Sequence, residues 1–407
     1  WTRESDAMVM GYDIAEALSD GLNFGRGEDD YTVVITGAGE GEFDAKYTWD
    51  RGKIISALAA MRQSINTEAT AAYAEPVTDW TQEERFIYHA GEEGITLNEE
   101  ATADAIETAL GQGEFVCTVE ATVNAVLPGG NIDDLKAATS FIASYTTKFS
   151  ARRDDEVKQN RKFNIQKAAD IINGNTVPPG EEWSFNTVVG PRTYELGWTG
   201  ANGISGGKEY SIQAGGGICQ VSSTLYYALL CANMEIVDRR AHTIPSDYVP
   251  VGLDATVDTR GIDFVWKNNT DMPAYIFARV EKVEGSSSRH TITVYVYGKP
   301  LPEGVTYQSR NEIIEERSRQ DEAIYTNDAS IPTGYQLERV QGHKYYVAEA
   351  YQDKYVDGKL AESKLLYTDK YKGNPPEVSI GTGAPLASGQ TPDPAWKPYG
   401  TPLEDAN

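Results

Sequence analysis

The sequence predicts a multi-domain α+β protein, in which small α+β modules precede a β-rich α+β domain and a small all-β domain follows it. Three observations lead to this fold class. A chain of 407 residues is too long for one ordinary core. Helical and strand-like patterns alternate up to about residue 300, and short strand-like pieces between glycines come after them. Tyrosine is abundant, at 24 residues against 10 phenylalanines, which suits sheets with half-exposed aromatic positions.

The first 150 residues are predicted to form the N-terminal part. Residues 1–30 are an acidic, glycine-rich segment, and residues 31–150 are expected to form small α+β modules. The expected elements are strands at 31–36, 85–89 and 115–126 and helices at 53–65 and 99–110. No residue here has a role that can be argued chemically, so an unspecialised spacer is nearly as good an interpretation.

Residues 151–300 are predicted to form the central domain. An amphipathic helix is expected at 161–172, ended by the Asn173-Gly-Asn and Pro178-Pro-Gly turns. Three later segments alternate or run apolar and are expected to form one antiparallel sheet behind the functional site, namely 262–266, 274–280 and 290–297.

Three segments are expected after the central domain. Residues 301–329 are polar and charged and are predicted to be a strand or helix that leads into a linker. Residues 330–383 show short strand-like pieces around glycines, with a hairpin turn at Val356-Asp-Gly-Lys-Leu, and predict a small all-β domain. Residues 384–407 are rich in Pro, Gly, Ser and Thr, which predicts a disordered tail.

Charge and hydropathy exclude several classes of function. With 61 acidic and 36 basic residues, the net charge of -25 would repel nucleic-acid phosphates and anionic lipid surfaces. Cationic or zwitterionic ligands fit this charge better, although keeping a secreted protein soluble is the simpler account of it. The sequence contains no run of about 18 apolar residues, so it predicts no membrane span. The chain opens at Trp1 without a leader pattern, so we expect any signal or anchor to precede this sequence.

The three cysteines, Cys117, Cys219 and Cys231, leave at least one thiol free whichever two of them pair. Cys117 lies in an apolar strand-like stretch and Cys231 among apolar helical residues, so both are interpreted as core residues. The histidines and cysteines show no ligand spacing, so neither a metal nor another cofactor is expected.

Cys219 is the candidate nucleophile. It follows Gly215-Gly-Gly-Ile and precedes apolar residues at helical spacing, which places it at the first turn of a buried helix. The unpaired N–H groups and the positive dipole end at such a position can lower a thiol pKa from about 8.5 to between about 3.5 and 7.5. A lone cysteine beside glycines is nevertheless more often an inert core residue. The candidate oxyanion hole is the backbone of Gly216, Gly217 and Ile218.

His242 is the candidate base, because among the four histidines it alone lies near Cys219 in the sequence. A helix of about 15 residues rises on the order of 20 Å, and about eight to ten extended residues return a similar length. His242 is therefore expected roughly 3 to 4 Å from the Cys219 sulfur. A hydrogen-bonded surface or turn histidine is the alternative.

Several blocks of the central domain resemble the VanW family, and together they span about 130 residues. The upstream region, most clearly Glu92-Glu-Gly-Ile-Thr-Leu-Asn98, resembles the peptidoglycan-binding domain that often precedes VanW domains. Residues 330–383 resemble the β-domain family named for its five glycines. The blocks are Trp183-Ser-Phe-Asn-Thr-Val-Val-Gly-Pro-Arg-Thr193, Gly215-Gly-Gly-Ile-Cys-Gln-Val-Ser-Ser-Thr-Leu-Tyr-Tyr227, Glu235-Ile-Val-Asp-Arg-Arg, His242, Tyr248-Val-Pro-Val-Gly-Leu-Asp-Ala-Thr256 and Lys267-Asn-Asn-Thr-Asp271.

The resemblance implies peptidoglycan L,D-transpeptidation by an extracytoplasmic, cell-wall-associated cysteine acyltransferase. Cys219 would attack the carbonyl of the third residue of a donor tetrapeptide stem, release D-alanine and hold the stem as a thioester. The side-chain amine of the third residue of an acceptor stem would then form a third-to-third cross-link, with His242 as the base. The implied partners are stem peptides; no nucleic acid is expected, and a membrane only through an anchor that precedes this sequence.

Two other functions stay open at this point. A thiol hydrolase, either an endopeptidase or a carboxypeptidase, would differ only in that water resolves the thioester. A non-catalytic wall-binding protein would use the glycine and cysteine block for structure alone.

Four further residues are candidates for supporting roles. Asp254 is expected to orient His242, with turn capping in Gly252-Leu-Asp-Ala-Thr as an equal alternative. Arg192 is expected to bind a stem carboxylate, with bracing of the Gly190-Pro-Arg turn as an equal alternative. Ser222 and Ser223 are expected to donate hydrogen bonds to substrate, although helix capping is the simpler account.

Overall fold

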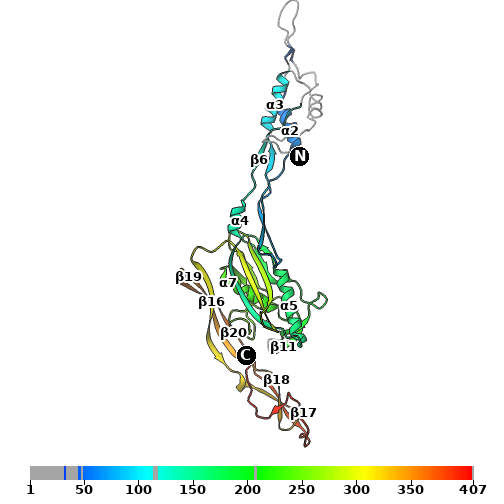
Figure 1. Ribbon diagram of the computed structural model, residues 1–407, viewed down its shortest axis with the longest axis vertical. Coiled ribbons are helices and arrows are strands. Elements are labelled where there is room, and N and C mark those ends of the chain that lie inside the picture. The colour runs from blue at the N-terminus through cyan, green and yellow to red at the C-terminus, as the bar shows by residue number, and fades with distance from the viewer. Residues whose placement is uncertain (1–31, 34–44, 47–48, 113–117, 206–208, 406–407) are drawn as a thin grey trace, which may run out of the picture. The chain divides into compact units, whose positions relative to one another are not determined.

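The computed structural model describes residues 32–33, 45–46, 49–112, 118–205 and 209–405 (Figure 1). It contains two compact units, one of residues 1–74 and 88–135 and the other of residues 75–87 and 136–407. The predicted α+β class and multi-domain organisation are confirmed. Cys117 lies outside the described residues. No helix within them is long and apolar enough to cross a membrane.

The first unit is built around two helices, α2 (Arg51–Ile65) and α3 (Glu99–Gly111). The side chains of Asp50 and Asn98 accept hydrogen bonds from first-turn N–H groups, which fixes where each helix begins. The helices share a small apolar core that includes Leu58 and Ile106. The strands of this unit are β1 (Thr32–Val33), which pairs with β2 (Ala45–Lys46), and β5 (Gly94–Leu97), which pairs with β6 (Val123–Val126).

Three elements lie where the chain passes between the units. They are β3 (Tyr73–Pro76), which pairs with β4 (Phe86–His89), and the helix α4 (Ile132–Ala138).

The second unit contains a four-stranded antiparallel sheet that includes β7 (Ser140–Ser150), β8 (Asn175–Val177), β14 (Ala274–Lys282) and β15 (Arg289–Gly298), in the order β7-β15-β14-β8. Two helices pack on it: α5 (Glu156–Ile172) contacts β14, and α7 (Ile218–Cys231) contacts β7 and β15. Alternate residues such as Ile276 and Val294 face these helices in the main core. Phe86 packs its ring on Tyr275 and Phe277 of the opposite face.

The two later strands predicted to pair, 274–280 and 290–297, do so as β14 and β15. The segment 262–266 was expected in the same sheet, and this expectation is wrong. It contributes β13 (Val265–Lys267), which lies between β12 (Glu235–Asp238) and β9 (Glu182–Ser184) in a separate sheet. Asp263 holds it there, because its carboxylate accepts hydrogen bonds from Ser184 Oγ and the Asn186 backbone N–H.

Two short elements complete the central domain. They are the helix α6 (Phe185–Val189) and the hairpin of β10 (Gly200–Ser205) with β11 (Glu209–Ala214).

The C-terminal region is all-β apart from the single turn η1 (Gln320–Glu322), as predicted. One sheet has the order β16-β19-β20 and the other β17-β21-β18-β22. Asp357 and Gly358 both have positive φ and form the expected tight turn between β19 and β20. The strands are β16 (Val305–Arg317), β17 (Ile324–Pro332), β18 (Tyr335–Val340), β19 (Tyr345–Val356), β20 (Lys359–Tyr371), β21 (Glu377–Gly383) and β22 (Lys397–Pro398).

Two segments of this region differ from expectation. The segment 301–329, expected to lead into a linker, contains β16 and most of β17, whose residues are largely exposed and therefore polar. The predicted disordered tail, 384–407, is ordered in part. Its strand β22 pairs with β18, and the Trp396 ring lies 6.2 Å from that of Tyr335.

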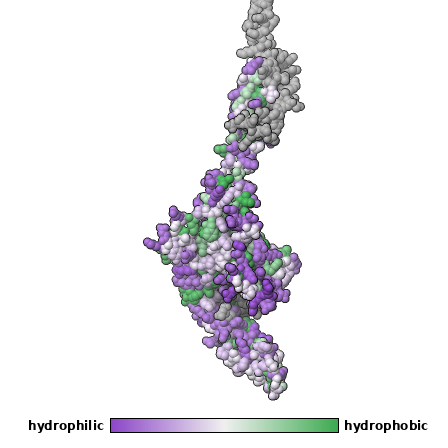
Figure 2. Space-filling view, in the orientation of Figure 1, coloured by the Kyte–Doolittle hydropathy of each residue, from purple (hydrophilic) through white to green (hydrophobic). Residues whose placement is uncertain are grey.

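Hydrophilic side chains cover most of the face of the second unit shown in Figure 2.

Candidate active site

Helix α7 carries the candidate nucleophile at its start. Cys219 is the second residue of α7, after the N-cap Gly217, and its side chain is half-buried. Most of the helix that follows is buried in the main core, which fixes the position of its first turn. Cys219 and His242 both line a cleft of about 1040 Å³. The predicted placement of Cys219 at the N-terminus of a buried helix is therefore found in the structure.

The glycines before Cys219 are required by crowding around the backbone. Gly217 has φ +102°, in the left-handed region that favours glycine. A Cβ on Gly216 would lie 2.3 Å from the carbonyl oxygen of Ala201, which is closer than atoms can approach. The backbone therefore turns sharply into α7, and larger residues cannot take these positions without a backbone shift.

The oxyanion hole expected from the sequence needs correction. The N–H of Gly216 donates to Gln213 O at 3.2 Å, and the N–H of Ile218 donates to Gly215 O at 3.2 Å. These turn hydrogen bonds occupy two of the three predicted donors. Over the described part of the chain, the N–H groups of Gly217 and Cys219 have no acceptor, so these two are available to a developing oxyanion.

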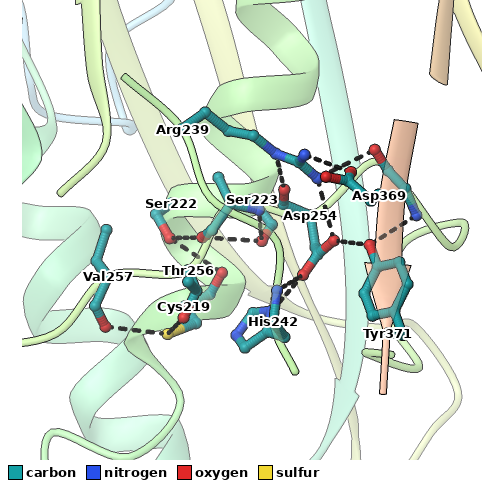
Figure 3. A network of polar contacts seen from close by, with 12 residues as sticks. Cys219, Ser222, Ser223, Arg239, His242, Asp254, Thr256, Val257, Asp369 and Tyr371 are labelled. Carbon is teal, nitrogen blue, oxygen red and sulfur yellow. Dashed lines mark hydrogen bonds and ion pairs between the residues drawn. The ribbon is translucent and has the colours of Figure 1, made fainter. Parts of the chain in front are cut away.

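His242 and Asp254 lie beside Cys219, as Figure 3 shows. The backbone N–H of His242 donates to Asp254 Oδ2 at 2.8 Å, and the ring Nδ1 is hydrogen-bonded to the same oxygen. His242 lies close enough to Cys219 for each side chain to shift the pKa of the other. Because Nδ1 is held by Asp254, Nε2 is the ring nitrogen left to face the sulfur. The structure thus places the predicted nucleophile, base and orienting carboxylate next to one another in the order Cys219, His242 and Asp254. We call this row of side chains the line.

The electrostatics of this line favour a thiolate and an imidazolium. Burial raises the pKa of the Cys219 thiol, but the hydrogen bond and charge of His242 outweigh it, and the pKa lies below its ordinary value. Burial lowers the pKa of His242, but the charge and hydrogen bond of Asp254 outweigh this effect and raise it. The pKa of Asp254 is lowered well below its usual range, since His242 and Arg239 overcome the effect of burial. Thr256 Oγ1 and Val257 O also contact the sulfur, at 3.7 and 3.4 Å.

Asp254 is fixed by residues that sequence reasoning missed. Its second carboxylate oxygen accepts hydrogen bonds from the Tyr371 hydroxyl and from Arg239 Nη2. Tyr371 Oη also accepts the backbone N–H of Gly252 at 2.8 Å, and Arg239 forms an ion pair with Asp369. Tyr371 and Asp369 come from β20 of the C-terminal region, 117 and 115 residues beyond Asp254 in sequence. One sequence signal could have pointed to these two residues. The stretch Tyr367-Thr-Asp-Lys-Tyr371 alternates as a strand does, which puts Asp369 and Tyr371 on one face.

Ser222 and Ser223, expected to contact substrate, have a different task. Both side chains are fully buried. Ser222 Oγ donates to Ala255 O at 2.6 Å, and Ser223 Oγ accepts the Ala255 N–H at 2.9 Å. The two hydroxyls therefore attach the segment that carries Asp254 to helix α7 by satisfying the backbone C=O and N–H of Ala255.

Arg192 lines the cleft and also braces a turn. Its Nη1 donates to Asn186 Oδ1 at 2.7 Å and to Gly190 O at 3.1 Å, so hydrogen bonds to neutral oxygens brace the turn, whereas the alternative interpretation expected an internal salt bridge there. Two further cleft residues, Arg161 and Tyr248, were missed by sequence reasoning. Burial raises the pKa of Tyr248. The described residues contain no group of three or more His, Cys, Asp or Glu side chains placed to hold a metal ion.

Two solved structures resemble a part of this chain. One is the G5 domain of an IgA1 protease, with 16% identity over 19% of this chain and 93% of that one, at a TM-score of 0.14. The other is HP0197-G5, with 24% identity over 18% of this chain and 97% of that one, at a TM-score of 0.12.

Two relatives and one family model match the chain. The chain is 40% identical to the uncharacterized protein YoaR of Bacillus subtilis (strain 168) over 158 residues, which are 39% of this chain and 48% of YoaR. It therefore spans about half the length of that relative. It is 28% identical over 226 residues to the vancomycin B-type resistance protein VanW of Enterococcus faecalis (strain ATCC 700802 / V583), over 53% of this chain and 70% of VanW. The family model described as VanW like protein matches residues 160–291, which include Cys219, His242 and Asp254. Residues 160–291 therefore form a VanW-like domain.

Proposed function

We propose that this protein is a peptidoglycan L,D-transpeptidase that forms third-to-third cross-links through a cysteine thioester. The line of Cys219, His242 and Asp254, of which Cys219 and His242 face the cleft, is the observation that carries this proposal. A nucleophile, a base and a group that orients the base are what acyl transfer by a thiol requires. The similarity to a protein named for vancomycin resistance favours a cell-wall substrate.

In the acylation step, the Cys219 thiolate attacks the carbonyl carbon of the third residue of the donor stem. The oxyanion that forms accepts hydrogen bonds from the N–H groups of Gly217 and Cys219. When the bond to D-alanine breaks, the imidazolium of His242 gives its proton to the leaving amine. The stem is then held as a thioester, and His242 is neutral.

In the second step, the side-chain amine of the acceptor stem attacks the thioester carbonyl. His242 takes a proton from this amine as the carbon–nitrogen bond forms, and the carbon–sulfur bond breaks to release the thiolate. Asp254 stabilises the imidazolium that results, because its carboxylate is hydrogen-bonded to the ring. The site returns to the ion pair with which it began. The protein acts outside the cytoplasm, at the cell wall, and its partners are stem peptides.

Incubation of the protein with a disaccharide-tetrapeptide, followed by mass analysis of the products, tests this proposal. We expect cross-linked dimer and free D-alanine. Tripeptide without dimer would indicate a hydrolase, and unchanged substrate would support a non-catalytic wall-binding protein. Cys219→Ala should give no product. Cys231→Ala is the matched control, since Cys231 lies at the far end of the same helix and should retain turnover.

A further inference from the structure

The cleft around Cys219 has a charge opposite to that of the whole chain. Two Asp side chains and six Lys or Arg side chains line it, whereas the chain has 61 acidic and 36 basic residues. A cleft of one sign concentrates ligands of the other sign. The preference for cationic ligands expected from total charge therefore does not extend to the cleft. The six cations are Lys148, Lys158, Arg161, Arg192, Arg260 and Arg339.

Three of these cations already have a carboxylate partner. Lys158 pairs with Asp155, Arg260 with Asp258, and Arg339 with Asp328. The other three, Lys148, Arg161 and Arg192, form no ion pair with any described residue. Lys148 is exposed, so water solvates its charge. Arg161 and Arg192 are the two cations that are both partly or fully buried and without a counter-ion.

Arg161 and Arg192 lie on the two sides of the glycine loop that precedes Cys219. A Cβ on Gly217 would come within 2.7 Å of Arg161 Cγ, and one on Gly215 within 2.8 Å of Arg192 Cβ. The two side chains therefore pack directly against the loop. Both charges also act on the site. Burial lowers the pKa of Arg192, against the raising effect of Cys219 and of the more distant carboxylates of Asp258 and Asp263, with which it forms no ion pair. Arg161 lowers the pKa of Tyr248.

Each of these guanidinium groups is held by neutral oxygens only. Arg161 Nη2 donates to Gln220 Oε1 at 2.7 Å, and Arg192 Nη1 donates to Asn186 Oδ1 and Gly190 O. A guanidinium has five N–H donors, so each group keeps donors for a ligand. Arg192 is 8% exposed, and burial of a cation without a counter-ion costs free energy that an anionic ligand would restore.

We propose that Arg161 and Arg192 form a carboxylate-binding site beside Cys219, through which the protein selects peptide acyl donors with a free carboxylate near the scissile bond. The fork of N–H donors on arginine matches the two oxygens of a carboxylate, and an amidated donor would leave both guanidinium groups without an anion. The identity of the donor rests on the proposed function above. The preference for an anion beside the sulfur does not depend on turnover.

Alkylation of Cys219 by iodoacetate and by iodoacetamide tests the site without a substrate. The two reagents differ in a carboxylate against an amide, so their rate ratio reports how strongly the surroundings of the sulfur attract a carboxylate. We expect Arg161→Gln and Arg192→Gln each to lower the ratio of iodoacetate to iodoacetamide rates at least about fivefold, from the loss of one nearby positive charge. N-acetyl-D-alanine should also slow alkylation of Cys219 more than its amide does, and inorganic phosphate should protect less than N-acetyl-D-alanine.

Arg279→Gln is the matched control, because Arg279 lies on β14, pairs with Glu281 and does not line the cleft. Its rate ratio should equal that of the unaltered protein. Since Arg192 braces a turn, circular dichroism and thermal unfolding must show that the variant is folded; if it is not, Arg161→Gln alone decides. An unchanged ratio in folded Arg161→Gln, or equal protection by N-acetyl-D-alanine and its amide, overturns the proposal. Anion preference without any cross-linking would keep this site and remove only the proposed reaction.

Discussion

Cys219 and Cys231 stand near opposite ends of one helix, and their surroundings give the two thiols opposite properties. Burial raises the pKa of Cys231 to about 11, whereas His242 holds the pKa of Cys219 below its ordinary value. We expect alkylation of Cys219 by iodoacetamide to extend to lower pH than that of a cysteine with an ordinary pKa. Cys231 should react only as the pH approaches its raised pKa. Mass analysis of the two cysteine peptides across a pH series measures both rates in one sample.

His242 is the cause of this difference, so its removal should abolish most of it. In His242→Ala we expect the alkylation profile of Cys219 to move to higher pH, because burial then acts without an opposing positive charge. His89→Ala, in the first unit, is the control and should leave the profile unchanged. The thiolate interpretation would be contradicted by identical pH profiles for Cys219 and Cys231 in the unaltered protein.

At the scale of residues, the sequence could predict the positions of those side chains that are set by the local pattern of helix and strand. The glycine block and the apolar helix after it predict the position of Cys219, and the lengths of helix and return strand predict that His242 comes back to it. The sequence could not assign the hydroxyls of Ser222 and Ser223, because whether a serine faces a cleft or a neighbouring backbone is decided by tertiary packing. For the same reason, the turn hydrogen bonds that occupy Gly216 and Ile218 could not be foreseen.

At the scale of elements, strand β20 supports the candidate active site although its side chains do not line the cleft. We expect Tyr371→Phe to lower kcat with little change in KM, because it removes a buried hydrogen bond to Asp254 and so loosens His242. The loss of a hydrogen bond to a charged group should also cost about 1.5–3 kcal/mol of stability. Steady-state kinetics with the stem-peptide substrate, together with urea unfolding, measure the two effects.

A purely structural role for Tyr371 would show itself differently. It would lower stability but leave the pH profile of Cys219 alkylation in place, whereas we expect this profile to shift toward higher pH in Tyr371→Phe. Tyr325→Phe is the control, since Tyr325 lies on β17 and its side chain is 55% exposed. It should change neither measurement.

Among the elements, those with strong local signals were predictable and those defined by distant pairing were not. The helix expected at 161–172 is found as α5, but it begins earlier, at Glu156, because Asp155 caps it. The strand at Val265–Lys267 has an ordinary apolar pattern, and nothing in that pattern specifies its partners β9 and β12. The polar composition of 301–329 suggested a linker, yet half-exposed strands carry the same charged residues on their outer face.

At the scale of the molecule, the buried ion pair of His242 and Asp254 links stability to pH. The lowered pKa of Asp254 contributes stability that is present above its unfolded value, about 3.9, and is lost as the pH falls below it. The raised pKa of His242 contributes stability that is full below its unfolded value, about 6.5, and is lost as the pH rises through its folded pKa. The VanW-like domain should therefore be most stable between these limits.

Asp254→Asn should remove this dependence. We expect it to destabilise the VanW-like domain by about 3–5 kcal/mol near neutral pH, since it leaves a buried charge without its partner. The difference from the unaltered protein should shrink as the pH approaches about 3.9, where the carboxylate itself becomes protonated in the unfolded chain. Urea unfolding followed by tryptophan fluorescence measures it, because Trp183, Trp198 and Trp266 are buried in this domain. A constant difference across pH would refute the linkage.

The hydrogen bond from Tyr371 to Asp254 and the ion pair between Arg239 and Asp369 also bear on how such chains can be recombined. The family match ends at residue 291, yet the groups that fix the active-site carboxylate extend to residue 371. A chimera joined between these two positions would combine Cys219, His242 and Asp254 from one parent with strand β20 from another. Such hybrids should work only where the second parent supplies a tyrosine and an acidic residue in the same register, which makes the stretch from the start of β7 to Tyr371, residues 140–371, rather than the family domain alone, the smallest unit to transplant.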